Sequence, residues 1–236
     1  DDAAWQALRG ALDGWIARLS AVLRLEPSDY AADSATWTAG GLRGSLDGFA
    51  SPAAAWAVRY ANQEARDAEE ADENGGGARS AGFNVWLAPR LPVPHLSVYV
   101  GVRNGRATFM ADHLPRFDGA LHPGHVAAFF GGDRAAHWAA LQRPGGAGAL
   151  RSFRSADAAV RAVQGPNALA LTGDASDADA VERLVSELDA HVSAWLRWTR
   201  STPLLDDQGV IEGVAARDRA VRVALREHER EAGVRF

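Results

Sequence analysis

The chain contains no cysteine and no lysine. Without cysteine it has no disulfide bonds, thiolate metal ligands or thiol catalysis, and it forms no thioether link to a chromophore. All 25 basic residues are arginine, which also excludes Schiff-base chemistry on a lysine. No apolar run approaches the roughly 18–20 residues of a membrane span, and no apolar segment follows a basic start as in a signal peptide. We therefore expect a cytoplasmic protein with no membrane partner.

The charge balance and the length exclude further classes. The formal net charge is −5 at pH 7, whereas nucleic-acid-binding proteins usually carry a basic surplus. Nucleic acid is therefore not an expected partner. The 236 residues could form one large domain or two small ones. Because no linker-like run divides the chain, we expect a single domain over residues 1–236.

The clearest local signal is the dipeptide Asn104-Gly105, which is flanked by two runs of alternating apolar residues. A two-residue type I′ turn favours this dipeptide because both turn residues take positive φ angles. Pro94 and Pro115 bracket the two runs, as expected of residues that cannot continue a strand ladder. The pattern predicts a central antiparallel hairpin.

Periodicity predicts the other elements and the fold class. Apolar residues at three- and four-residue steps predict helices over 2–22, from a cap at Ser176 to Leu196, and over 210–231. Strands are expected over residues 34–49, 83–87 and 168–172. The segment 53–58 fits either a strand or a short helix, and the segment 155–163 fits neither clearly. The charged and glycine-rich segment 64–77 favours a surface loop. Helices at both ends and strands between them favour an α+β fold, a three-layer α/β/α sandwich around one antiparallel sheet.

An acidic residue interrupts the apolar stripe of the last predicted helix. Asp218 falls in phase with that stripe, and burying a lone carboxylate is costly unless it is paired or hydrogen-bonded. One interpretation is a structural salt bridge to Arg222 or to a neighbouring helix. The other is that Asp218 faces a polar ligand between the sheet and the helix. His228, farther along the stripe, is either a peripheral histidine or a ligand contact.

A second polar group lies on or beside the predicted hairpin. His95 and Tyr99, four residues apart, share one face of their strand, whereas Asp112 and His113 point to opposite faces. A carboxylate and an imidazole within reach of each other would form a proton relay. The alternative is that the Asp112-His113 pair at the strand end meets only solvent.

Signals for bound metals and cofactors are weak. Four histidines have a spacing that fits no standard ligand pattern: His113, His122, His125 and His137. No glycine-rich turn in dinucleotide-binding form follows a strand, and no Gly-x-Ser-x-Gly motif is present. We therefore expect neither a metal nor a tightly bound nicotinamide, flavin or nucleotide. A redox reaction would then need electrons from an external donor.

Several short motifs together resemble the red chlorophyll catabolite reductases, a branch of the ferredoxin-dependent bilin reductase superfamily. In chain order they are Pro94-His95-Leu96, Asp112-His113-Leu114-Pro115-Arg116, Leu121-His122-Pro123, Arg161 with Gly165-Pro166-Asn167-Ala168, His191-Val192-Ser193 and Arg217-Asp218-Arg219. Each motif is short, and their shared order from about residue 83 to residue 235 carries the resemblance.

The resemblance implies an α/β/α sandwich that holds an open-chain tetrapyrrole between the sheet and the C-terminal helices. Such enzymes hold no metal or flavin, take electrons one at a time from reduced ferredoxin, and use side chains as proton donors. Family members are often dimers, so a homodimer is possible here.

The resemblance also implies a set of ligand-binding residues. Arg116 and Arg161 are candidates for contacts to propionate groups, because a guanidinium fork suits carboxylates. Asp112 and Asn167 lie within the matched motifs, and His228 lies on the last helix. We expect these residues to contact the ligand.

The catalytic candidates implied by the resemblance are Tyr99, His95 and Asp218. Asp218 matches a family aspartate near the bilin. The family carries an acidic proton donor five residues past the proline of the Pro-His motif, and Tyr99 occupies that position here. A phenol, with an ordinary pKa of about 10, matches proton donation less well than a tuned carboxyl group.

The sequence leaves three candidate functions. The first is a bilin-reductase-like enzyme that reduces a linear tetrapyrrole, or a similar conjugated ligand, with electrons from ferredoxin. The second is a cofactor-free, non-redox cyclisation or isomerisation in specialised metabolism, and the third is a tetrapyrrole-binding protein without catalysis. Because ferredoxins are acidic, the first function needs a local arginine patch. Its candidates are Arg103 and Arg106, or Arg217, Arg219 and Arg222.

Overall fold

The computed structural model describes residues 1–28, 36–39, 41–64, 77–141, 143, 148–155 and 158–231. The strands are β1 (Glu26–Pro27), β2 (Thr36–Ala39), β3 (Leu42–Ala50), β4 (Ala54–Glu64), β5 (Arg79–Leu87), β6 (His95–Arg103), β7 (Arg106–Leu114), β8 (Arg151–Ser152) and β9 (Leu169–Asp174). The helices are α1 (Asp2–Leu23), α2 (Pro123–Phe130), α3 (Gly132–Leu141), α4 (Ala158–Val163), α5 (Ala178–Ser201) and α6 (Gln208–Glu231).

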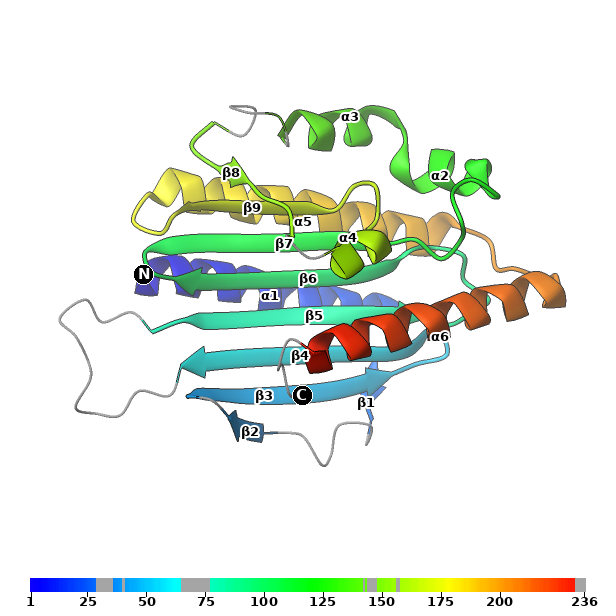
Figure 1. The fold of residues 1–236 in the computed structure, drawn as a ribbon, viewed down its shortest axis with the longest axis horizontal. Coiled ribbons are helices and arrows are strands. Elements are labelled where there is room, and N and C mark those ends of the chain that lie inside the picture. The colour runs from blue at the N-terminus through cyan, green and yellow to red at the C-terminus, as the bar shows by residue number, and fades with distance from the viewer. Residues whose placement is uncertain are drawn as a thin grey trace.

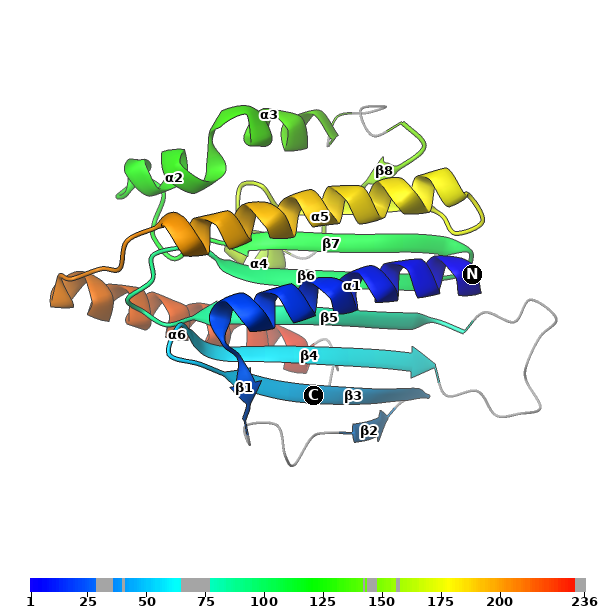
Figure 2. The same ribbon diagram turned by 180° about the vertical axis from the view of Figure 1, so that it is seen from behind.

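The strands form one antiparallel sheet with helices on both faces (Figure 1). Its order is β1-β3-β4-β5-β6-β7-β9-β8, and β2 pairs with β3. Seen from behind, α1 and α5 lie side by side across one face (Figure 2), whereas α4 and α6 lie on the other. The predicted α+β sandwich with a central antiparallel sheet is therefore confirmed. None of the described helices is long and apolar enough to cross a membrane.

The hairpin at the centre of the sheet is confirmed. Asn104 has φ 50° and Gly105 has φ 70°, so both turn residues are left-handed as a type I′ turn requires. The two strands pair from His95 opposite Leu114 to Arg103 opposite Arg106 without a register shift. Because side chains alternate along a strand, this register fixes which residues of β6 and β7 share a face.

The apolar core fills the space between the sheet and the pair α1 and α5. On this side β6 and β7 contribute fully buried residues such as Val100 and Phe109, and the helices contribute residues such as Leu8 and Leu188. Burying one such side chain contributes about 1.5–3 kcal/mol to the free energy of unfolding. This packing makes the sheet a rigid support for whatever its opposite face carries.

Several local expectations are resolved or corrected. Residues 53–58 belong mainly to strand β4, and the ambiguous segment 155–163 contains helix α4. The N-cap of α5 is Asp177 rather than the predicted Ser176: the side chain of Asp177 accepts a hydrogen bond from Ala180 N, whereas Ser176 donates to Asp174. The predicted surface loop over 64–77 lies largely outside the described residues.

Candidate functional site

The sheet face turned toward α4 and α6 differs from the apolar face behind it. Its residues on β5, β6 and β7 are Ser80, Asn84, Ser97, Tyr99, Thr108, Met110 and Asp112, because these alternate with the buried core residues. Most are only partly buried, and Met110 is 39% exposed. We call these seven residues the open face. Polar side chains gather on this face within reach of solvent.

One row of the open face joins three strands. Asn84 on β5 pairs with Ser97 on β6, and Ser97 pairs with Asp112 on β7. The Ser97 hydroxyl donates to Asn84 Oδ1 at 2.7 Å. Neither Asn84 nor Ser97 is among the predicted site residues. The sequence carries a signal only for Ser97, which alternates in phase with His95 and Tyr99, whereas Asn84 joins them through the register of β5.

Tyr99 lies on the open face, as its phase with His95 predicted. Its ring packs against Gly101, where a Cβ atom would stand 2.8 Å from the Tyr99 hydroxyl. Tyr60 packs in the same way over Gly82, on the strands beside it. The two glycines therefore let two phenol rings lie along the sheet. Burial raises the pKa of Tyr99, against the opposing effects of a hydrogen bond to Ser80 and the charge of Arg103.

Asp112 is a buried carboxyl group without a cationic partner among its described contacts. Both of its oxygens accept from Gly165 N, at 3.0 and 3.2 Å. Burial raises the pKa of Asp112 to about 8, although backbone hydrogen bonds from Gly165 and His113 oppose the shift. At neutral pH this group is mainly a neutral carboxylic acid.

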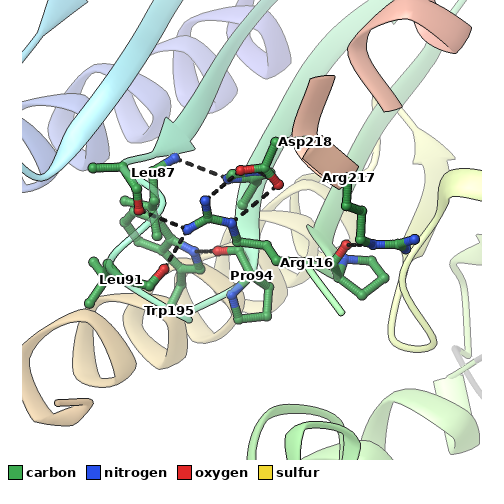
Figure 3. Close-up of polar contacts among 10 residues, drawn as sticks. Leu87, Leu91, Pro94, Arg116, Trp195, Arg217 and Asp218 are labelled. Atoms are coloured by element: carbon green, nitrogen blue, oxygen red, sulfur yellow. Dashed lines mark hydrogen bonds and ion pairs between the residues drawn. The ribbon is translucent and has the colours of Figure 1, made fainter. Parts of the chain in front are cut away.

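Asp218 is buried in an ion pair that fastens α6 to the sheet (Figure 3). Its Oδ2 accepts from Arg116 Nη2 at 2.5 Å, and its Oδ1 accepts from Arg116 Nε at 3.3 Å. Arg116 also donates through Nη1 to the carbonyl oxygens of Ala88 and Leu91. The salt-bridge interpretation of Asp218 therefore describes this structure, with Arg116 in place of the expected Arg222.

His95 completes the same network. Its Nε2 lies 2.9 Å from Asp218 Oδ1, and its Nδ1 accepts from Leu87 N at 3.0 Å. Because a backbone N–H points at Nδ1, the ring carries its proton on Nε2 and donates to Asp218. Burial lowers the pKa of His95 to about 4, although its hydrogen bond to Asp218 opposes the shift. The imidazole is thus neutral at pH 7.

Burial alone would raise the pKa of Asp218, but the hydrogen bonds from His95 and Arg116 and the charge of Arg116 hold it below the ordinary range. Asp218 can therefore lie in the apolar stripe of α6, because His95 and Arg116 donate hydrogen bonds to its carboxylate. Arg222, the partner expected from sequence, instead places its guanidinium 5.7 Å from the ring centre of Trp86.

The other predicted site residues lie at separate places in the structure. Arg161 is exposed on α4 and donates to Ser155 O at 2.8 Å, whereas Asn167 is buried in the turn before β9. Asp112 and His113 point to opposite faces, as predicted, and His113 stacks on His191 of α5 with ring centres 3.8 Å apart. The imidazole of His95 does meet a carboxylate, that of Asp218 on α6. The side chain of His228 lies outside the described residues.

The described residues offer no group of three or more histidine, aspartate or glutamate side chains that could hold a metal ion. What they offer is a set of side-chain acids on one sheet face. Asp112 can give up a proton near neutral pH, and the Tyr99 hydroxyl can donate a hydrogen bond. The arrangement suits proton delivery to a flat ligand resting on the sheet.

Comparison with known proteins places the fold. The layers of this α/β/α sandwich match the fold of a solved structure. The chain superposes on the crystal structure of tomato phytochromobilin synthase in complex with biliverdin with a TM-score of 0.66, at 12% sequence identity. The match covers 89% of this chain and 68% of that chain. The resemblance expected from the sequence is thus confirmed at the level of the fold.

Sequence comparisons add no closer relationship. No protein-family profile matches the chain, and no curated protein sequence matches it. The likeness to the tomato enzyme therefore concerns the fold, and the function has to be argued from the residues on the open face.

Proposed function

We propose that the chain is a bilin-reductase-like enzyme. It holds an open-chain tetrapyrrole, or a similar conjugated ligand, on the open face between the sheet and helices α4 and α6. It reduces this ligand with electrons from an external ferredoxin. The fold it shares with a protein solved with biliverdin supports the ligand class. The observation that carries the proposal is the position of Asp112, which is buried on the open face and accepts from the backbone N–H of Gly165. Burial there raises its pKa.

The proposed chemistry needs proton donors that the chain supplies itself. A two-electron reduction of a conjugated tetrapyrrole consumes two electrons and two protons, and a ferredoxin delivers the electrons singly. Each reduced intermediate then gains basicity and takes a proton from a nearby acid. Asp112 suits this step because its pKa of about 8 lies near the working pH. The carboxylate left behind is stabilised by the Gly165 N–H.

Tyr99 is proposed as the second group at the ligand. Its position two residues along β6 from Ser97 places it in the row next to Asp112. Because burial raises its pKa, the phenol stays protonated and can donate a hydrogen bond to a ligand carbonyl or nitrogen. We assign it to orienting the ligand and to a slower proton transfer than that from Asp112.

His95 and Asp218 are proposed as positioning residues rather than proton donors. The Nε2–H of His95 donates to Asp218 Oδ1, and Arg116 donates to both carboxylate oxygens of Asp218. Together they hold α6 over the sheet. Because Arg116 is committed to this pair, the exposed Arg161 is the better candidate for a propionate contact.

The electron donor is proposed to dock on α6. Arg219 and Arg222 are exposed on this helix, and Arg222 lies over Trp86, next to the open face. An acidic ferredoxin would meet positive charge there despite the net charge of −5. Such a position would bring the donor close to the ligand.

The test begins with binding. Titration of the purified protein with biliverdin should shift and sharpen the visible absorption bands, and anaerobic addition of reduced ferredoxin should then convert the bound pigment. A spectral shift without conversion would support the binding-protein alternative. No shift at all would support the non-redox alternative and end this proposal.

The variant Asp112→Asn tests the assigned acid. It should still bind biliverdin and accept an electron, but it should accumulate a radical intermediate detectable by electron paramagnetic resonance. Asp206→Asn, at an exposed position before α6, is the matched control and should turn over like the wild type. Normal turnover in Asp112→Asn would remove Asp112 from the mechanism.

A further inference from the structure

Helices α1 and α5 lie side by side on the side of the sheet away from the open face (Figure 2). Residues of both helices line a groove. Its volume is about 410 Å³, which is within the range of small-molecule sites. Three arginines line it: Arg18 from α1, and Arg197 and Arg200 from α5. Ser193 adds a hydroxyl group, and Val22 and Leu196 add apolar surface. None of its lining residues is acidic.

The three guanidinium groups differ in how they are held. Arg18 is fixed, because its Nη1 donates to Asp189 Oδ1 at 2.8 Å and its Nη2 donates to Ser193 Oγ at 2.9 Å. Trp15 Nε1 holds the same Asp189 oxygen at 2.9 Å. Arg197 and Arg200 are exposed and make no side-chain hydrogen bond or ion pair with the described part of the chain. Asp189 accepts from Arg18, from Trp15 and from the Ser193 hydroxyl, so its charge is matched by Arg18. The charges of Arg197 and Arg200 have no such partner among the described residues.

Helix-end electrostatics explain only part of this arrangement. A cation in the last turn of a helix is favoured by the helix dipole, and this accounts for Arg200 at the end of α5. It does not account for Arg197, which lines the same groove three residues earlier on α5 and is also exposed. Several guanidinium groups lining one groove are a common means of binding oxyanions.

We propose that this groove is a binding site for a small organic anion that carries at least two anionic oxygens, as a phosphate ester or a polycarboxylate does. Arg197 and Arg200 bind the anionic end of the ligand in bidentate contacts, and Arg18 adds a fixed positive charge beside that end. The apolar part of the ligand rests on Val22 and Leu196. The site does not depend on the proposed function, because the sheet and the two helices separate it from the open face.

Isothermal titration calorimetry of the full chain tests the site, with inorganic pyrophosphate and citrate as separate probes at matched ionic strength. At least one probe should bind with one-to-one stoichiometry, and the tighter of the two distinguishes phosphate from carboxylate recognition. The variant Arg197→Gln/Arg200→Gln should weaken that binding by about tenfold or more. Both positions are exposed, so circular dichroism should show an unchanged fold.

The matched control is Arg143→Gln/Arg151→Gln, which removes two exposed arginines elsewhere on the chain. It should bind the probe as tightly as the wild type. The proposal is overturned if neither probe binds at millimolar concentration. Equal weakening in both double variants would also overturn it, because binding would then follow net charge alone.

Discussion

Two buried aspartates show how neighbours decide the state of one residue type. Asp218 has Arg116 and His95 as donors, and its pKa stays below the ordinary range. Asp112 has only backbone donors among its described contacts, and burial raises its pKa to about 8. The difference follows because a nearby cation stabilises the charged form, whereas burial alone stabilises the neutral form. One aspartate is therefore structural, and the other is available as an acid.

The first prediction concerns the pH dependence of stability. Between pH 6.5 and 8 the folded chain keeps a proton on Asp112 that the unfolded chain has lost, because the ordinary pKa of an aspartate is 3.8. Stability should therefore fall as the pH rises through this window, by about 1–2 kcal/mol in total. Urea unfolding at several pH values measures the slope, and Asp112→Asn should abolish it.

Two histidines with lowered pKa values act in the opposite direction from Asp112. His95 and His125 have pKa values lowered by burial to about 4, and in the unfolded chain they titrate near 6.5. Their contribution is present above pH 6.5 and is lost as the pH falls toward 4, which is the opposite direction. A wild-type stability that stays constant from pH 6.5 to 8 would mean that Asp112 is already ionised in the fold.

The second prediction concerns the buried ion pair. Arg116→Met leaves the Asp218 carboxylate buried with His95 alone, and should lower the free energy of unfolding by about 3–5 kcal/mol. The double variant Arg116→Met/Asp218→Leu removes both charges and should cost clearly less than this. Urea denaturation with an unchanged m-value is the measurement. Arg151→Met, on the surface, is the control and should change little.

At the scale of elements, the hairpin β6–β7 and the helix α1 use glycine in opposite ways. Gly105 has φ 70° in the turn, so it occupies a region that other residues enter only at a cost. Gly10 lies in the middle of α1 on its exposed side, and its backbone is helical. A Cβ at either position would meet nothing within 4 Å, so backbone conformation alone separates the two sites.

The third prediction uses this pair of glycines. Gly105→Ala should destabilise the fold by about 1–2 kcal/mol, because alanine is strained at positive φ. Gly10→Ala should stabilise it by about 0.5–1 kcal/mol, because alanine loses less entropy in a helix. Thermal and urea unfolding of the two variants give the comparison directly. Equal effects of the same sign would contradict the assigned turn geometry.

At the scale of the whole molecule, the sheet separates two environments. The side under α1 and α5 is a closed apolar core, whereas the open face carries polar groups that are partly exposed. The net charge of −5 would repel an acidic electron donor in general. The proposed reaction therefore depends on local positive charge, which α6 offers at Arg219 and Arg222.

The fourth prediction follows from this charge distribution. At low ionic strength, Arg219→Gln/Arg222→Gln should slow the second-order reduction of the bound pigment by ferredoxin, because it removes electrostatic steering. At high ionic strength the variant and the wild type should converge, since salt screens exposed charges. Stopped-flow absorption measures both rates. An unchanged rate at low salt would place the docking surface elsewhere, with Arg103 as the next position to test.

The sequence by itself determined the local elements and excluded several kinds of chemistry. Asn104-Gly105 predicted the central turn, apolar periodicity predicted α1, α5 and α6, and the missing cysteine and lysine removed thiol and Schiff-base mechanisms. These features are local: turn geometry, helical period and residue chemistry depend on a few neighbouring positions. The helical period alone also showed that Asp218 is a charged residue in an apolar stripe.

Only the tertiary structure decided which groups meet. Arg116 reaches Asp218 across 102 positions of sequence, and Ser97 and Asn84 come together through strand register. The pKa of Asp112 depends on how deeply it is buried and on the absence of a described cation beside it. Burial and long-range pairing are properties of the packed chain, because they arise from segments that are distant in sequence. The residue proposed as the acid could therefore be identified only in the fold.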